Sequence, residues 1–384
     1  METTNKWVLV LLVLLPTYLV RFSVWGVPLN LYDLFAVGGF AYCVIHYHGW
    51  KLHRGFSWSA LSLLLIGIIA VLVSDHKADA LGIYKSYLVV PIMIGVMIQT
   101  ARPKWQAVVQ ALGCSLLFVS GVAVFQWLSG YGVPAPWQVG GVDVRMTSIY
   151  DYPNAVGLLA APIVALSLAW LIHERSNRLF HAVVAVFGCL AIGLSQSDGA
   201  VLAVGVAIGI SLLFTRYRTW VVAAGVGLTM IVLVVPAARQ KVLLQDTSGE
   251  VRQALWQGTV HLLKARPLQG AGLANFPDVY AQYKLDRHVE LLLYPHNLFL
   301  DFWVEFGLLG AIWITIVLLR FMWNALHNTK HAHSLVLLTG MMAMVAYGLV
   351  DVPYFKNDLA VLFWVFLAFS DVLFKANPTT HVRH

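Results

Sequence analysis

The sequence predicts an all-α integral membrane protein that crosses the bilayer about twelve times. One observation is composition, since 59% of the 384 residues are hydrophobic and only 11% are charged, whereas soluble proteins carry roughly 25% charged residues. The other is that apolar residues form continuous runs, without the alternation that marks a barrel strand. Together they exclude a soluble fold and favour membrane-spanning helices.

Polar interruptions define the predicted spans. A helix needs about 20 residues to cross about 30 Å of hydrocarbon, so the shorter runs have to include flanking residues at the interface. No repeat and no low-complexity linker divides the chain, and residues 1–384 are therefore predicted to form one membrane domain. The predicted spans are residues 7–20, 31–45, 57–73, 84–100, 106–128, 154–172, 180–194, 200–214, 220–236, 297–319, 335–350 and 359–374.

Basic residues near the span ends predict the orientation. Short loops on one side carry them in pairs, for example Lys51 with Arg54, whereas both long hydrophilic loops fall on the other side. Because cytoplasmic loops are enriched in Lys and Arg, we expect both termini in the cytoplasm. Arg21 and Pro28 follow the first span in place of a small-residue cleavage site, so this span is expected to be retained.

The formal charge of +7 does not by itself predict nucleic-acid binding. In a membrane protein the location of basic residues matters more than their sum, and those on the outer loops are available for an anionic substrate. The three cysteines, Cys43, Cys114 and Cys189, lie in apolar stretches without CxxC spacing, which argues against disulfides and a zinc site. HExxH and DxD spacings do not occur either, so no metal is predicted.

Two outer loops, 129–153 and 237–295, are too long to be turns. The second lies between the predicted ninth and tenth spans. Loops of such length carry a substrate site or their own secondary structure. We therefore expect the large loop to form part of an active site.

The large loop is itself expected to be helical. Thr247 or Ser248 with Glu250 predicts the start of an amphipathic helix, and Pro267 ends it. A second short helix is expected around residues 278–284. The apolar positions of the first helix include Val251, Leu255, Val260 and Leu262.

The sharpest group of residues begins where this loop re-enters the membrane. Pro295 predicts a helix start, with His296 and Asn297 in the first turn. Gly307 and Gly310 follow about three and four helical turns later on the same face, so close packing should hold the imidazole at the outer boundary. A neutral imidazole accepts protons near neutral pH, which makes His296 a candidate general base.

Each candidate also has a plainer interpretation. His296 can be a helix-start histidine satisfied by backbone or water, and Asn297 can simply cap the helix. Asp301 and Glu305 lie inside a span, where acids are costly and often functional, but a structural pair is the alternative.

The re-entry segment resembles the signature of the bacterial O-antigen ligase family. The matching string is His296-Asn297, nine residues, Gly307, two residues and Gly310. The resemblance therefore supports a catalytic role for His296 more strongly than the position of this histidine alone does.

Two other patterns are similar to that family. Arg145 precedes Pro153-Asn154, as an arginine precedes a helix-opening Pro-Asn in the family, and Arg252 opens a loop pattern. The rest of that loop pattern is Trp256, Pro267, Gly270, Gly272 and Phe276. One departure is Asp198, which stands in Ser-Asp-Gly where family members often have Ser-Arg-Gly. An aspartate cannot bind a diphosphate as arginine does, so no such role is assigned to this position.

The resemblance implies transfer of a glycan from undecaprenyl diphosphate to a lipid A-core sugar hydroxyl, at the periplasmic face of the bacterial inner membrane. It implies an inverting, metal-independent reaction without a cofactor. The implied partners are the carrier-linked donor, the lipid A-core acceptor and membrane lipids, with no nucleic acid and no obligate protein partner. On this view His296 is the base, and Arg145 and Arg252 bind the diphosphate. Further candidates for substrate binding are Asn297, Asp301 and Glu305.

Other functions stay open. An O-antigen polymerase or a protein O-oligosaccharyltransferase belongs to the same superfamily, and one dominant outer loop favours the ligase by analogy. A transporter of lipid-linked glycans is also compatible with twelve spans. Transporters place polar groups near the midplane of two similar halves, whereas here the halves differ and the polar group lies at the outer boundary.

Overall fold

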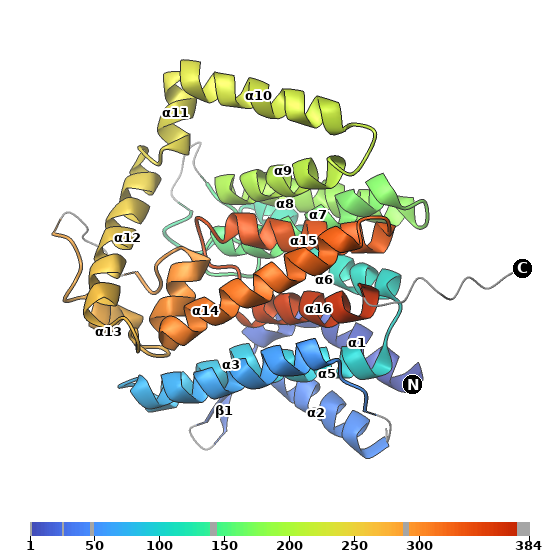
Figure 1. Ribbon diagram of the computed structural model, residues 1–384, viewed down its shortest axis with the longest axis vertical. Helices are drawn as coiled ribbons and strands as arrows, with labels where there is room; N and C mark the ends of the chain where they lie inside the picture. Colours follow the sequence, from blue (N-terminus) through green and yellow to red (C-terminus); the bar gives the residue numbers. More distant parts are fainter. Residues whose placement is uncertain (1, 25–26, 47–49, 139–143, 287–291, 375–384) are drawn as a thin grey trace, which may run out of the picture.

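The fold was analysed in a computed structural model that describes residues 2–24, 27–46, 50–138, 144–286 and 292–374. Most of these residues are helical, and Figure 1 shows most of the helices running in roughly the same direction, with helix α12 crossing their ends. The prediction of an all-α membrane protein agrees with this architecture.

Every predicted span corresponds to helical structure. The helices are α1 (Glu2–Val13) with the 3-10 helix η1 (Leu15–Leu19), α2 (Leu31–His46), α3 (Arg54–Val73), α4 (Lys77–Ile83), the π-helix η2 (Tyr84–Val89), α5 (Val90–Ala101), α6 (Trp105–Ser129), α7 (Asn154–His173), α8 (Arg178–Leu194), α9 (Asp198–Leu212), α10 (Arg218–Val234), α11 (Pro236–Val242), α12 (Thr247–Ala265), α13 (Phe276–Tyr280), α14 (Leu298–His327), α15 (Ala332–Tyr347) and α16 (Asn357–Leu373).

Five helical segments are long and apolar enough to cross a membrane. They are Arg54–Val73, Lys77–Ala101, Trp105–Ser129, Asn154–His173 and Leu298–His327. Other apolar helices among the described residues, such as α8 and α15, are shorter. A multi-pass membrane protein is therefore supported, and the number of twelve crossings stays a prediction.

A β-hairpin departs from the all-helical prediction. Strands β1 (Arg21–Val24) and β2 (Val27–Asn30) pair antiparallel, with Arg21 opposite Asn30. The hairpin leads directly into α2, where the Asn30 Oδ1 accepts a hydrogen bond from the Asp33 amide at 2.8 Å. This cap satisfies an amide at the helix start, so the loop after the first helix is ordered rather than irregular.

Helix α7 lies at the centre of the bundle. It packs against α8, α9 and α15, and most of its side chains are buried, including Trp170. Glycines allow close approach here, because Gly188 faces Val164 and Gly340 faces Leu166. Such packing replaces the hydrophobic effect as the force between helices in lipid. Helix α10, in contrast, has no buried residue and lies apart from the bundle in Figure 1.

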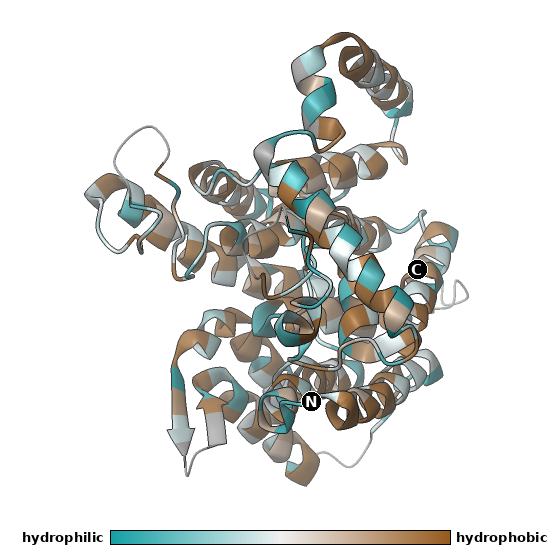
Figure 2. Ribbon diagram, turned by 90° about the vertical axis from the view of Figure 1, so that its left-hand side faces the viewer, coloured by the Kyte–Doolittle hydropathy of each residue, from teal (hydrophilic) through white to brown (hydrophobic). Residues whose placement is uncertain are grey.

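The polar segments gather at one end of the bundle. Helices α12 and α13 lie at this end, opposite the start of α1 and the end of α16 (Figure 1). Figure 2 faces this end and shows hydrophilic residues along the helix nearest the viewer and in the loops. Residues 375–384, for which a cytoplasmic position was predicted, lie outside the described residues, as do residues 287–291 of the large loop.

The large loop contains both expected helices with shifted starts. Helix α12 is capped by Asp246, whose Oδ1 accepts from the Gly249 amide at 2.9 Å, rather than by a Thr247 or Ser248 capping box. Leu255 and Leu262 are buried as predicted, whereas Val260 is exposed. Helix α13 ends at Tyr280, so it begins and ends earlier than residues 278–284. Its early start follows from a proline in the first turn, which is preorganised for a helix.

Candidate active site

His296 lies just before helix α14, and the prediction that it belongs to the first helical turn is wrong. Its φ of 49° is left-handed, and the helix begins at Leu298 with Asn297 as the N-cap. The Asn297 Oδ1 accepts from the Phe299 and Leu300 amides at 3.1 Å each. Because an N-cap residue needs a non-helical backbone, the helix cannot start at Pro295. The plainer interpretation of Asn297 as a cap is therefore what the structure shows.

The imidazole of His296 pairs with a carboxylate that the sequence analysis missed. His296 Nδ1 lies 3.1 Å from Asp351 Oδ1, in the segment between α15 and α16. The Asp351 side chain is 1% exposed and that of His296 is 19% exposed. The Tyr294 ring packs at 4.6 Å from the imidazole. Burial of the acid with partial exposure of the histidine is what a base needs, since one nitrogen must reach solvent or substrate.

This pairing selects a tautomer. A carboxylate only accepts hydrogen bonds, so the Nδ1 of His296 carries the proton and Nε2 is left as the acceptor. Nε2 makes no hydrogen bond to the described residues. The Oδ1 of Asp351 also accepts from the Val352 amide at 2.9 Å, which fixes the carboxylate. The arrangement of an oriented base with a free lone pair is that of a general base in acyl and glycosyl transfer.

Helix α12 holds both sides of this pair. Arg252 Nε donates to the Val350 carbonyl at 2.9 Å, next to Asp351. One turn later, Trp256 Nε1 donates to the Pro295 carbonyl at 2.9 Å, next to His296. The spacing of four residues places both side chains on one helix face. The Arg and Trp of the sequence pattern therefore position the two segments that carry the histidine and the aspartate.

Arg145 is bound at the start of α7. Its Nε donates to the Ser195 carbonyl at 3.0 Å, and Nη2 donates to the Asn154 Oδ1 at 2.9 Å and the Gln196 carbonyl at 3.3 Å. The guanidinium also lies 5.5 Å from the Trp137 ring centroid. Burial lowers the pKa of Arg145 from its ordinary value, but an arginine stays charged at neutral pH.

Each arginine keeps one terminal nitrogen without a hydrogen bond to the described residues. In Arg145 this is Nη1, because Nε and Nη2 bind the protein. In Arg252 it is Nη2, because Nη1 donates to the Ser248 hydroxyl at 2.8 Å. Tyr347 lies within electrostatic range of both guanidinium groups. Each of these half-buried guanidinium groups therefore still has a donor to offer to an anion.

Comparison with known families identifies a large part of this site. Residues 182–315 match the O-antigen ligase family model. This segment is similar to an O-antigen ligase domain and is called the ligase domain below. It contains α12 with Arg252 and the His296 re-entry segment, whereas Arg145 and Asp351 lie outside the matched residues. Among curated proteins there is no match. The domain supports a glycosyltransferase-type membrane enzyme of the O-antigen ligase and polymerase superfamily.

The glycines of the ligase domain have a role that differs from the prediction. Gly307 has φ 68° and ψ −170°, which interrupts α14, so the helix face from His296 to Gly310 is not continuous. The Leu268 carbonyl occupies the space of a Gly307 side chain and accepts from the Leu308 amide at 3.1 Å. The Val304 carbonyl, which that amide would bind in a regular helix, accepts from Ala271 at 2.8 Å instead.

The two acids inside α14 lie in different surroundings. The Glu305 side chain accepts from the Ala274 amide at 2.9 Å and so holds the turn that follows α12. Asp301 is 1% exposed, and neither of its carboxylate oxygens has a hydrogen-bond partner among the described residues. Glu305 thus has a structural contact, whereas Asp301 is a buried acid without one.

Lys356 is a second residue that sequence reasoning did not single out. Its ammonium lies 3.4 Å from Asp358 Oδ2 and 3.9 Å from the Tyr150 ring centroid. Burial lowers the pKa of Lys356, and the charge of Asp358 opposes this effect. The segment 348–356 therefore meets α12 at one end and the 144–153 segment at the other.

The described residues contain no group of three His, Cys, Asp or Glu side chains that could hold a metal ion. The chemistry available to the site consists of the His296 base with Asp351, the two arginines and nearby tyrosines. These groups suit proton transfer and anion binding.

Proposed function

We propose that the protein is a ligase that transfers a glycan from undecaprenyl diphosphate to a sugar hydroxyl of lipid A-core. The reaction is inverting and takes place at the periplasmic face of the bacterial inner membrane. The observation that carries this proposal is the His296–Asp351 pair, held by Arg252 and Trp256 of the ligase domain.

The acceptor hydroxyl is the nucleophile. Its oxygen attacks the anomeric carbon while the proton passes to His296 Nε2. Asp351 accepts the Nδ1 hydrogen bond and stabilises the imidazolium that forms, as in other base–carboxylate pairs. The proton then returns to solvent. His296 acts only if Nε2 is free, which agrees with its lack of a hydrogen bond to the described residues.

The leaving group is undecaprenyl diphosphate. The bond between the anomeric carbon and the diphosphate oxygen breaks, and the electron pair stays on that oxygen. The free nitrogens of Arg145 and Arg252 bind the charge that develops there. Since the donor already carries a good leaving group, alignment and charge stabilisation are the main contributions required of the protein.

The remaining features of the proposal concern the membrane. Twelve crossings with cytoplasmic termini would place the loops 129–153 and 237–295 in the periplasm, where the second forms part of the active site. As substrate contacts, the two arginines rank before Asn297, Asp301 and Glu305. The side chains of Asn297 and Glu305 already accept hydrogen bonds from backbone amides. Cysteine labelling of single-cysteine variants from the two sides of the membrane tests this orientation.

An acceptor assay tests the reaction. Purified protein in lipid nanodiscs receives carrier-linked glycan together with lipid A-core, and the products are separated by mass. Ligase activity gives glycan-bearing lipid A-core. A longer carrier-linked chain would identify a polymerase, and transfer to protein would identify an oligosaccharyltransferase. Movement of unmodified carrier-linked glycan across a vesicle membrane, without transfer, would identify a transporter.

A further inference from the structure

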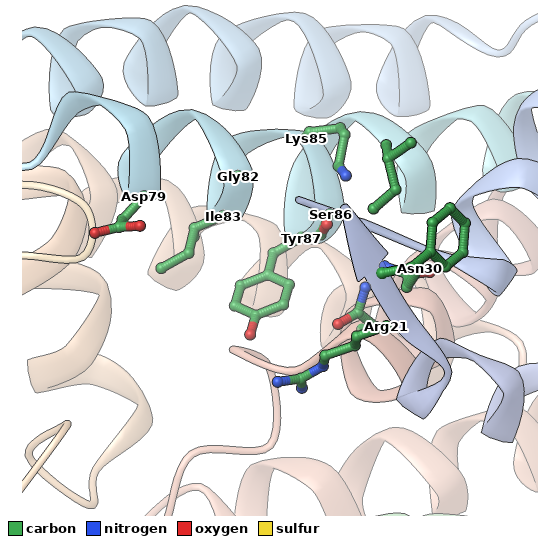
Figure 3. A pocket seen from close by; sticks show the side chains of 11 residues that line it. Arg21, Asn30, Asp79, Gly82, Ile83, Lys85, Ser86 and Tyr87 are labelled. Carbon is green, nitrogen blue, oxygen red and sulfur yellow. The ribbon is translucent and has the colours of Figure 1, made fainter. Parts of the chain in front are cut away.

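A pocket of about 340 Å³ includes Asn357, the residue that follows the segment 348–356. The β1–β2 hairpin, the end of α4, the π-helix η2 and the first residue of α16 form its walls. In Figure 3 the guanidinium of Arg21 and the hydroxyl of Tyr87 project into the same open region, with Asp79 at one side. Polar groups of several kinds therefore face one cavity.

Two of the lining groups have no protein partner. Asn357 is 5% exposed, and its Nδ2 makes no hydrogen bond among the described residues. The guanidinium of Arg21 is exposed and forms no hydrogen bond or ion pair with a described residue. Lys85, in contrast, is held 2.8 Å from Asp33. An unpaired buried amide is costly, so a ligand in this pocket would gain a hydrogen bond that the protein leaves open.

The pocket is connected to the His296–Asp351 pair through shared structure. The Tyr354 hydroxyl donates to the Tyr87 carbonyl at 3.0 Å, which joins the segment 348–356 to the pocket wall. Tyr87 lies within electrostatic range of Tyr152. Tyr294, whose ring packs beside His296, lies within electrostatic range of Tyr152. The hydrogen bond from Tyr354 thus joins the pocket wall to the segment that carries Asp351.

The position of the pocket indicates which substrate it serves. Arg252 binds the Val350 end of the segment 348–356, whereas Asn357 follows its other end. In a single displacement the nucleophile attacks the anomeric carbon from the side opposite the departing group. With a diphosphate at Arg252, the Asn357 end of the segment is then left for the sugar that carries the nucleophile.

We propose that this pocket binds the acceptor saccharide, and that Arg21 pairs there with an anionic substituent of that sugar while the Asn357 amide donates to a sugar oxygen. Tyr87 supplies an aromatic surface for the ring. This inference rests on the proposed glycan transfer, because it assigns the second substrate of the same site. It predicts a preference for acceptors that carry a negative charge.

Arg21→Gln tests the proposal, since this exposed side chain has no hydrogen bond to a described residue to lose. With wild-type protein as reference, the KM for lipid A-core should rise about tenfold, the size expected for one charge-assisted hydrogen bond. The KM for the donor and kcat at saturating acceptor should not change. Asn357→Asp, which keeps the shape and replaces the donor by an acceptor, should raise the acceptor KM as well. Arg175→Gln is the matched control, because Arg175 is exposed at the opposite end.

A pair of acceptors that differ only in one phosphate substituent provides the second arm. The effect of Arg21→Gln should be large for the phosphorylated acceptor and absent for the other. An unchanged acceptor KM in both pocket variants, or a raised donor KM, would overturn the inference while leaving the proposed transfer intact.

Direct binding separates the two proposals. Binding of lipid A-core is measured on His296→Ala protein with and without Arg21→Gln. If the wild type transfers no glycan but binding depends on Arg21, the pocket stands and the proposed reaction fails. If binding does not depend on Arg21, the pocket assignment fails, whatever the activity of the wild type.

Discussion

Both ends of the helix bundle carry basic residues, and several of them differ in exposure between the two ends. At the end opposite α12, Arg175, Arg178 and Arg218 are exposed on short loops. At the α12 end, Arg145 and Arg252 are half-buried and each binds backbone carbonyls. An exposed charge is solvated and contributes little to stability. Burying a charge costs desolvation free energy, and its hydrogen bonds hold the side chain in one geometry. Arginines are therefore solvated at three positions of one end and fixed by backbone carbonyls at two positions of the other.

Histidines show the same contrast. His181, near the end opposite α12, is fully buried and stacks on Trp170, and neither ring nitrogen has a partner. His296 has a carboxylate on one nitrogen and keeps the other free. Burial alone thus does not make a histidine a general base. One ring nitrogen must be held by a partner, and the other must be free to accept the proton of the substrate hydroxyl. The following experiments test whether function is confined to the α12 end.

The largest effect is expected from His296→Ala. Loss of the general base should lower the rate of glycan transfer by about 10³- to 10⁴-fold, measured as initial rate with purified protein. His327→Ala removes an exposed histidine at the far end of α14 and should leave the rate unchanged. Equal losses in the two variants would show that the two ends do not differ in this respect.

A smaller loss is expected from Asp351→Asn. The amide cannot hold the Nδ1 tautomer as a carboxylate does, so kcat should fall about 100-fold while the donor KM stays the same. Asp351 acts through His296, and adding Asp351→Asn to His296→Ala should therefore cause little further loss. Additive losses in the double variant would separate the two residues.

Gly307→Ala tests the turn that supports the site. Its φ of 68° with ψ of −170° is open almost only to glycine, and the Leu268 carbonyl fills the space. The free energy of unfolding should drop by about 1–3 kcal/mol. Chemical denaturation in detergent measures this change. Gly205→Ala has open space around it and should be neutral or slightly stabilising because alanine favours helices. The interpretation is wrong if the two glycines respond alike.

Arg252→Lys keeps the charge but removes the planar donor. The donor KM should rise about tenfold, because lysine cannot bind the Val350 carbonyl and a phosphate together. The measurement is the dependence of initial rate on carrier-linked glycan. A donor KM equal to that of the wild type would remove Arg252 from diphosphate binding.

The smallest effect is expected at the opposite end. Arg175→Gln changes an exposed loop residue. The rate of glycan transfer should not change, and the free energy of unfolding should stay within about 0.5 kcal/mol of the wild-type value. A clear loss of transfer in this variant would show that the basic residues at that end also contribute to function.

The sequence determined the helices and indicated most of the candidate site residues. Runs of apolar residues are a local property, and each predicted span is helical. His296, Arg145 and Arg252 were recognised because their neighbours in the chain form patterns that resemble one family. The start of α14 lies at Leu298, three residues after the predicted start at Pro295, since capping depends on which backbone conformation His296 adopts.

Only the tertiary structure decided the partners. Asp351 stands 55 residues from His296, and an acid in a short loop gives no sign of which side chain it will meet. The kink at Gly307 exists because the Leu268 carbonyl binds the Leu308 amide, a contact that no local pattern specifies. The pocket at Arg21 likewise combines residues from the hairpin, η2 and α16. Local chemistry sets which residues can act, and long-range packing sets which of them act together.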